Sequence, residues 1–353
     1  MKKFSMVFLW MTAALLLLWQ LPWLYSFMVP NKDKSPFVLY SPVLNDFTYS
    51  NGEGKQFIHT DSEGNRYTQR QIDSLHPVFY GRQLMSDGRF PDSIAMLPAN
   101  YKEIQQNVFY FRHSPRDINR PQLGIYQMME SMSGRVKLET PTDVFRIGSS
   151  GITFIDIESN QINPDKSSRF TDAMRKHGFV FPAICLSGNP SVKKDYDEGY
   201  LMLDAERKLY HIKQVKGRPF VQQIETPEGI VPKQLFITEF RNRSMLGFVS
   251  DTKNRLYAVT SADHRFVRLD IPEFDPAENA MMIYGMVYQW TVKISSKEKA
   301  AYYALDGKTL RLTKSYEVPQ ETSLAKTIGQ GLGLIGIRFS DPLDKFIYPR
   351  IGK

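Results

Sequence analysis

The chain contains 353 residues, of which 42% are hydrophobic and 13% aromatic. This composition excludes a disordered chain and provides enough apolar side chains for one large domain or two ordinary ones. The net charge of +8 is modest, and the basic residues are interleaved with acids. Because no block of lysine and arginine occurs, nucleic-acid binding is excluded as a function class. Cys185 is the single cysteine, so an internal disulfide is excluded and the domain must depend on its hydrophobic core.

The chain begins with an apolar segment that follows two lysines. Residues 4–21 contain no charged side chain and would extend about 27 Å as a helix, close to the thickness of the hydrocarbon layer of a bilayer. No face of this helix is polar, which argues against a buried helix of a soluble protein. Aromatic side chains cluster at its C-terminal end, as they do at membrane interfaces. The predicted interface anchors are Lys2, Lys3, Trp19, Trp23 and Tyr25.

A cleaved signal peptide is the main alternative for this segment, since signal peptides also combine a basic start with an apolar centre. Residues 22–28 contain no pair of small side chains at the spacing that a cleavage site needs, and no cysteine lies nearby for lipoprotein processing. We therefore interpret residues 1–28 as a cytoplasmic tip and a retained transmembrane anchor, and residues 29–36 as a polar tether. The positive-inside rule favours a cytoplasmic N-terminus by a small margin. The prediction is a single-pass protein of the bacterial inner membrane that contacts the lipid bilayer and places its C-terminal domain in the periplasm.

Beyond the tether, the dominant pattern is a short apolar strand that ends in an aspartate, followed by a polar turn and a second strand. Each unit is typical of a β-hairpin in which the Asp side chain accepts hydrogen bonds from backbone amides of the turn. Four of these aspartates are separated by 48, 47 and 55 residues, and a fifth precedes them by 95 residues. The five positions are Asp61, Asp156, Asp204, Asp251 and Asp306.

A repeat of about 40–50 residues built from hairpins is typical of β-propeller blades. A copy that lacks the aspartate is expected at residues 107–111. We therefore predict a mainly β fold, a propeller-like array of hairpins or blades with a few short helices, preceded by one transmembrane helix. An irregular β-sandwich or barrel built from hairpins is the alternative.

Three short helices are predicted between the strands. Thr68 and Gln71 fit a capping box at the start of the first helix. Ser168 is the expected cap of the second helix, which Gly178 ends. Residues 122–131 are the third.

These signals suggest a division of the chain behind the tether. Residues 37–140 form a mixed β and helical region, and residues 141–353 form a β-rich, propeller-like region. A single domain over residues 37–353 is the alternative.

Motifs for catalysis, cofactors and metals are weak. Residues 331–336 match G-x-G-x-x-G, but the 17 residues that follow are too few for the helix and the acid of a dinucleotide fold. The six histidines are isolated from one another, and the acids at residues 195–198 lack the spacing of a calcium loop. We therefore assign no catalytic, cofactor-binding or metal-binding residue. The acids proposed to meet in a pocket are Asp197, Glu198 and Asp263.

Several motifs are distinctive as a set, namely DSEGNRYT at 61–68, LHP at 75–77, YGRQL at 80–84, DGRFPDSI at 87–94 and PTDVFR at 141–146. By these motifs and the N-terminal anchor, the chain resembles a family of uncharacterised membrane-anchored proteins from Bacteroidota, classified as domain of unknown function 4857. The similarity covers nearly the full length. The family has no assigned chemistry, so the resemblance transfers no catalytic residue. It implies an accessory role beside ATP-driven exporters of the ABC type.

Two classes of function are consistent with these observations. The first is a membrane-anchored, non-enzymatic module on the extracytoplasmic side, which binds a partner such as an ABC-type permease through the loops of its β scaffold. The second is an envelope enzyme, for example one that acts on glycans, whose carboxylates converge in the channel of a propeller. Two acids about 5–10 Å apart in a concave pocket would favour the second class.

Overall fold

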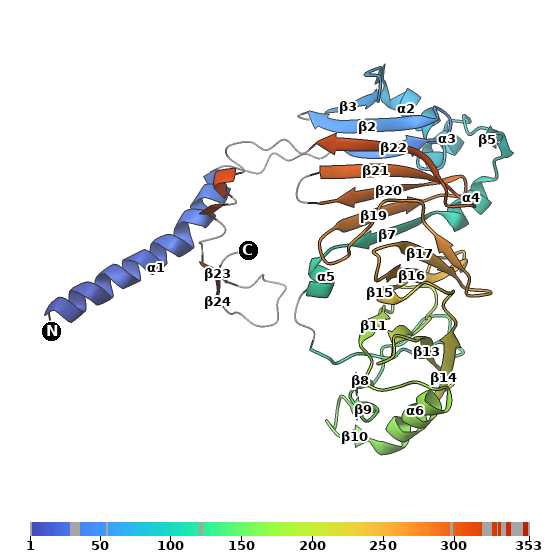
Figure 1. Ribbon diagram of the computed structural model, residues 1–353. Coiled ribbons are helices and arrows are strands. Elements are labelled where there is room, and N and C mark those ends of the chain that lie inside the picture. Colours follow the sequence, from blue (N-terminus) through green and yellow to red (C-terminus); the bar gives the residue numbers. More distant parts are fainter. Residues whose placement is uncertain are drawn as a thin grey trace. The chain divides into compact units, whose positions relative to one another are not determined.

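The structure is a computed structural model that describes residues 2–28, 36–53, 56–119, 123–296, 299–319, 327–329, 331–332, 337–339 and 349–351. The chain divides into two compact units (Figure 1). The β unit comprises Phe37–Val318, and the anchor unit comprises Met1–Pro36 together with Pro319–Lys353.

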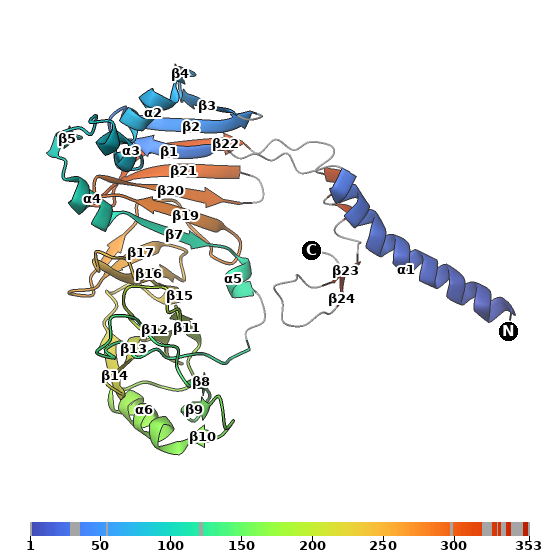
Figure 2. The ribbon, with the colours of Figure 1, turned by 180° about the vertical axis from the view of Figure 1, so that it is seen from behind.

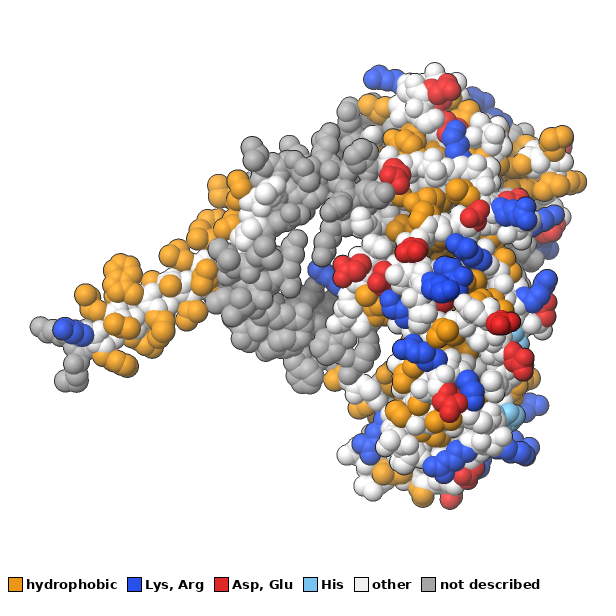
Figure 3. Space-filling view, in the orientation of Figure 1, with side chains coloured by type: hydrophobic (Ala, Val, Ile, Leu, Met, Phe, Trp, Pro, Cys, Tyr) orange, Lys and Arg blue, Asp and Glu red, His pale blue; other side chains and the backbone are white. Residues whose placement is uncertain are grey.

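The anchor unit contains the long helix α1, Lys2–Met28. Among the described residues, Lys3–Tyr25 is the one helical segment long and apolar enough to cross a membrane, and none of it is buried inside the protein. Figure 3 shows apolar side chains along this helix. An unburied helix that is apolar on all faces agrees with a membrane anchor or a signal sequence. The same unit holds the antiparallel pair β23 (Ile337–Phe339) and β24 (Pro349–Ile351).

Among the described residues, the β unit contains five antiparallel sheets of three or more strands, numbered here in chain order, and most of them contain four consecutive strands. Sheet 1 contains β1 (Phe37–Ser41), β2 (Asp46–Glu53), β3 (Gln56–Asp61) and β4 (Arg66–Tyr67). Sheet 2 contains β8 (Asp143–Ile147), β9 (Ile152–Asp156) and β10 (Ile162–Asn163). Sheet 3 contains β11 (Cys185–Gly188), β12 (Tyr200–Leu203), β13 (Leu209–Val215) and β14 (Arg218–Ile224). Sheet 4 contains β15 (Pro232–Ile237), β16 (Met245–Asp251), β17 (Leu256–Thr260) and β18 (Phe266–Arg268). Sheet 5 contains β19 (Ala280–Gly285), β20 (Gln289–Ser295), β21 (Lys299–Asp306) and β22 (Leu312–Pro319).

Each sheet packs against its neighbour through buried apolar side chains. Separate clusters join sheet 1 to sheet 5, sheet 5 to sheet 4, sheet 4 to sheet 3, and sheet 3 to sheet 2. Sheets 1 and 2 lie at the two opposite ends of this array (Figures 1 and 2). The predicted fold, a mainly β array of propeller-like blades preceded by an apolar helix, is confirmed. The array runs from sheet 1 through sheets 5, 4 and 3 to sheet 2.

The turns that follow the repeated aspartates have the predicted hydrogen bonds. At Asp61, Asp204, Asp251 and Asp306 the carboxylate Oδ1 accepts two backbone amides of the turn, at 2.7–3.1 Å. At Asp156 it accepts the amide and the hydroxyl of one serine, at 2.8 and 2.7 Å. The turns at Asp61 and Asp306 join the third and fourth strands of their sheets, whereas the other three join the second and third. The even spacing therefore reflects similar hairpins at two different places in a blade.

Two of the three predicted helices are present. Helix α2 (Gln69–Leu75) has the predicted capping box, in which the Thr68 side chain accepts from the Gln71 amide and the Gln71 side chain accepts from the Thr68 amide. Helix α6 (Pro164–Lys176) is capped by Asn163 and not by Ser168. The predicted cap is wrong because Asn163 and the proline at the first helical position give an earlier and stronger start.

The third predicted helix is wrong, because residues 123–131 contain no helix and residue 122 lies outside the described residues. Tyr126 in this stretch instead forms a two-way backbone pair with Phe145 of β8. The expected strand near residues 107–111 is present as β7 (Phe109–His113), but it joins sheet 5 beside β19 and forms no blade of its own.

The segment between sheets 1 and 2 also contains three further short helices and a small hairpin. The helices are α3 (Gly81–Ser86), α4 (Tyr101–Asn107) and α5 (Arg116–Asn119), and the hairpin is β5 (Ser93–Ile94) with β6 (Leu97–Pro98). A buried cluster that includes Leu39, Val78 and Ile104 packs this segment on sheet 1 and on the start of the β19–β20 turn.

Candidate functional site

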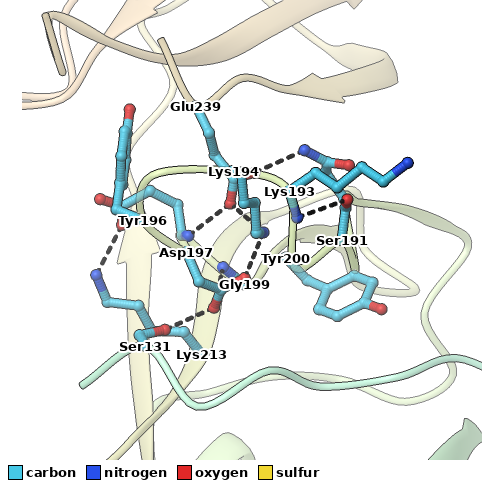
Figure 4. A network of polar contacts seen from close by, with 12 residues as sticks. Ser131, Ser191, Lys193, Lys194, Tyr196, Asp197, Gly199, Tyr200, Lys213 and Glu239 are labelled. Carbon is cyan, nitrogen blue, oxygen red and sulfur yellow. Dashed lines mark hydrogen bonds and ion pairs between the residues drawn. The ribbon is translucent and has the colours of Figure 1, made fainter. Parts of the chain in front are cut away.

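The strongest cluster of buried charge in the described residues lies between sheets 3 and 4 (Figure 4). Three chain segments that are far apart in sequence supply it. Residues 189–199 connect β11 to β12, Glu239 follows β15, and Ser131 comes from the irregular segment before β8. The β11–β12 and β15–β16 connections occupy the same position in two adjacent blades, which is why the fold brings them together.

Lys194 is the centre of this cluster, which we call the lysine clamp (Lys194, Asp197 and Glu239). Its Nζ lies 2.6 Å from Asp197 Oδ1 and 2.6 Å from Glu239 Oε1. The three side chains are only 7%, 2% and 2% exposed, in that order. One cation therefore faces two buried carboxylates, and the clamp carries one excess negative charge when all three groups are ionised.

Every carboxylate oxygen in the clamp accepts a hydrogen bond. Asp197 Oδ2 accepts from the Ser131 hydroxyl at 2.6 Å and from the Gly199 amide at 3.0 Å. Glu239 Oε1 also accepts from the Glu198 amide, and Glu239 Oε2 accepts from the Asn189 side chain, both at 2.8 Å. Burial raises the pKa of the Glu239 carboxyl, and Lys194 opposes that rise. Because both acids are buried and saturated with donors, the clamp binds sheet 3 to sheet 4 and presents no carboxylate to a substrate.

A second polar layer lies beside the clamp. Glu198 Oε2 is 2.7 Å from Lys213 Nζ, and the His211 ring bonds the Glu198 carbonyl oxygen at 2.7 Å. Burial lowers the pKa of His211 to about 4, so its imidazole is neutral at pH 7 and Nε2–H donates to that carbonyl. The Tyr196 hydroxyl donates to the Phe240 carbonyl at 2.8 Å, which adds another bond between the two connections.

The three acids that the sequence singled out have different partners. Asp197 is in the clamp and Glu198 is in the adjacent layer, whereas Asp263 forms its hydrogen bond and ion pair within its own turn, with Thr260 and Arg265. That they meet in a pocket stays a prediction. No group of three or more His, Cys, Asp or Glu side chains among the described residues is arranged to hold a metal ion.

Sequence reasoning missed Lys194, Glu239 and Ser131 as members of this site. Lys194 and Asp197 are three residues apart and of opposite charge, which is a weak local signal. Glu239 and Ser131 carry no signal at all, because only the packing of adjacent blades brings them to the β11–β12 connection.

The predicted interface anchors lie on α1, with Lys2 and Lys3 at its N-terminal end and Trp19, Trp23 and Tyr25 toward its C-terminal end. The rings of Trp23 and Phe27 stack with centroids 5.6 Å apart, and Trp19 and Trp23 are exposed. Gly329 of the C-terminal segment lies against the Tyr25 ring, where an added Cβ would be 3.1 Å from ring atom Cε1. Their contact with lipid stays a prediction.

Comparison with known proteins identifies one family. The model of the family described as Domain of unknown function (DUF4857) matches residues 37–305. This match covers all five sheets except Asp306 at the end of β21, the turn that follows it, and β22. No curated protein matches the chain by sequence.

Solved structures with low similarity include β-propellers. The structure titled Kuenenia stuttgartiensis Hydrazine Synthase has 10% identity, a TM-score of 0.29, and coverage of 52% of this chain and 47% of that chain. The Dos1 propeller has 10% identity, a TM-score of 0.30, and coverage of 51% and 45%. The Myceliophteria thermophila Cps50 (Swd1) β-propeller domain has 11% identity, a TM-score of 0.29, and coverage of 60% and 62%. The chain thus spans about half the length of the first two, and the description of the blades depends on the sheet topology alone.

Proposed function

The chain belongs to the family described as Domain of unknown function (DUF4857), and from that premise we propose that it is a membrane-anchored module whose β unit binds a partner outside the cytoplasm. The carrying observation is α1, of which Lys3–Tyr25 is apolar on all faces and buried nowhere in the protein. A helix of this kind is stable in water only when something else covers it, and a bilayer is the simplest cover. The absence of a cleavage motif after the apolar run supports a retained anchor over a signal peptide.

A binding role for the β unit is supported by the structural role of its buried carboxylates. Asp197 and Glu239 are saturated by donors, and the aspartates of the hairpin turns hold backbone amides. These carboxylates stabilise the blades and their connections. A rigid β scaffold of this kind presents its loops as a recognition surface.

The partner that we propose is an integral membrane protein, and an ABC-type permease is the first candidate. An anchor that confines the β unit to the membrane raises the effective concentration of any partner in the same bilayer, so even a weak contact becomes populated. The accessory role implied by the family resemblance is the reason for choosing a permease over other membrane proteins.

Affinity isolation from solubilised membranes tests this function. The full chain is compared with a chain lacking residues 1–28 and with a chain whose α1 is replaced by an unrelated transmembrane helix. We expect a permease to be isolated with the full chain and with the replaced anchor, and to be lost without the anchor. A full chain that is isolated alone, or that turns over an envelope glycan, contradicts the proposal.

A further inference from the structure

The chain enters and leaves the β unit at one end of sheets 1 and 5. Strand β1 starts at Phe37, which pairs with Ser50 of β2, and β22 ends at Pro319. The ring of Tyr316, three residues before that end, lies 4.9 Å from the ring of Tyr49, the neighbour of Ser50. In Figure 1 the arrowheads of β2 and β22 accordingly point to the same end of the β unit. We call this the tether end.

Both connections from the tether end lead to the C-terminal end of α1. Eight residues, 29–36, separate the end of α1 at Met28 from Phe37. Seven residues, 320–326, separate Pro319 from the short segment that contains Gly329, and Gly329 lies against Tyr25. Since one residue extends about 3.5 Å at most, each connection reaches no farther than about 30 Å. Chain length therefore limits how far the start of β1 and the end of β22 can lie from the segments of the anchor unit to which they connect.

An exposed aromatic side chain occupies the tether end. Phe57, beside the β2–β3 turn, is 67% exposed. It pairs across the strands with Gly52, which offers it no side chain, and its ring stacks beside that of His59 with centroids 6.4 Å apart. A single exposed apolar side chain needs no explanation on its own. Its position at the end where the chain connects to α1 gives it one, because aromatic rings are favoured at the level of lipid headgroups.

We propose that the tether end rests on the membrane surface and that the Phe57 ring inserts between lipid headgroups. This inference rests on the proposed function, since it needs α1 in the bilayer. The proposal fixes which end of the β unit faces the membrane. The β5–β6 hairpin, whose Met96 is 98% exposed, lies at the opposite end of the same region (Figures 1 and 2). On this proposal the hairpin faces away from the membrane.

Depth-dependent quenching in liposomes tests the proposal. The full chain with Cys185→Ser carries a single new cysteine, either Phe57→Cys or the matched control Met96→Cys, labelled with an environment-sensitive fluorophore. Liposomes of phosphatidylcholine and phosphatidylglycerol contain spin-labelled lipids as quenchers. We expect quenching at position 57 to exceed that at position 96 by at least about twofold. A label on Asn51→Cys, in the same hairpin, is expected to lose part of its quenching when Phe57→Ser is added.

The outcomes separate this proposal from the proposed function. A chain that floats with liposomes but is quenched equally at positions 57 and 96 overturns the proposed orientation of the β unit and leaves the proposed membrane anchor standing. Unchanged quenching at position 51 on Phe57→Ser overturns the insertion of the ring. A chain that fails to float with liposomes overturns both proposals.

Discussion

Replacing the lysine of the clamp is expected to destabilise the β unit strongly. Lys194→Met keeps most of the side-chain volume but removes the Nζ that lies 2.6 Å from Asp197 and 2.6 Å from Glu239. Two carboxylates that are each 2% exposed then face one another without a cation. Removing one partner of a buried ion pair costs about 3–5 kcal/mol, because the remaining charge stays buried without compensation. We expect the free energy of unfolding to fall by that amount at pH 7.

The loss should depend on pH in a direction fixed by the geometry. Without Lys194, burial and the charge of Asp197 raise the pKa of the Glu239 carboxyl in the folded state still further above its value in the unfolded state. A group with a raised folded pKa contributes stability at low pH and loses it as pH rises through the folded pKa. The deficit of Lys194→Met relative to the unmodified chain should therefore shrink as pH falls from 7 toward 5. Glu239→Gln added to Lys194→Met should recover part of the deficit, because it removes one of the two buried charges.

Urea-induced unfolding of the detergent-solubilised full chain, followed by far-ultraviolet circular dichroism, measures these changes. Lys193→Met is the matched control, since Lys193 is the exposed neighbour in the same connection and should change the free energy by less than about 0.5 kcal/mol. If Lys194→Met costs no more than this control, or if its deficit does not shrink at lower pH, the clamp does not hold the two sheets together.

Three further substitutions test the blades by the same unfolding measurement. Asp251→Ala removes two hydrogen bonds from backbone amides of its turn and the contact with Arg255. It should lower the free energy of unfolding by about 2 kcal/mol. Burial alone would raise the pKa of Asp251, but the Arg255 guanidinium and the turn amides have the larger effect, so the folded pKa lies below the usual 3.8. The stability that the ionised carboxylate contributes is therefore present above pH 3.8 and is lost as pH falls below it. Gly199→Ala should cost at least about 2 kcal/mol, because φ is +64° and an added Cβ would lie 2.4 Å from the Ile212 carbonyl oxygen. Phe170→Ala, at a fully buried position of α6, should cost about 3–5 kcal/mol.

Each of these expectations has a clear contrary result. An Asp251→Ala chain whose stability still falls at low pH as steeply as that of the unmodified chain contradicts the role given to this carboxylate. A neutral Gly199→Ala contradicts the close approach of the β11–β12 connection to β13. A Phe170→Ala chain of unchanged stability means that α6 does not belong to the core between sheets 2 and 3.

The hairpins were predictable from the sequence because their determinants are local. An aspartate followed by a polar turn fixes its own hydrogen bonds, and the capping box at Thr68 and Gln71 fixes the start of α2. The start of α6 was missed by a few residues because Asn163 and Ser168 are both acceptable caps, and only the proline between them marks the earlier one.

Non-local structure was outside the reach of these signals. Nothing in residues 107–113 indicates that β7 adds to a sheet whose other strands lie about 170–200 residues later in the chain. The sequence identified one member of the clamp, since Asp197 was selected as a pocket acid. Glu239 comes close to Lys194 only when sheets 3 and 4 pack. The burial of Asp197, which gives this acid a structural role in place of a pocket, likewise arises only when the blades pack.

The state of α1 in the mature protein tests the central claim most directly. Membranes are extracted with alkaline carbonate, and the intact mass of the protein is measured in the pellet and in the supernatant. The account predicts a chain that remains in the membrane pellet and retains residues 2–28. A mature chain that lacks these residues and is released to the supernatant would contradict it.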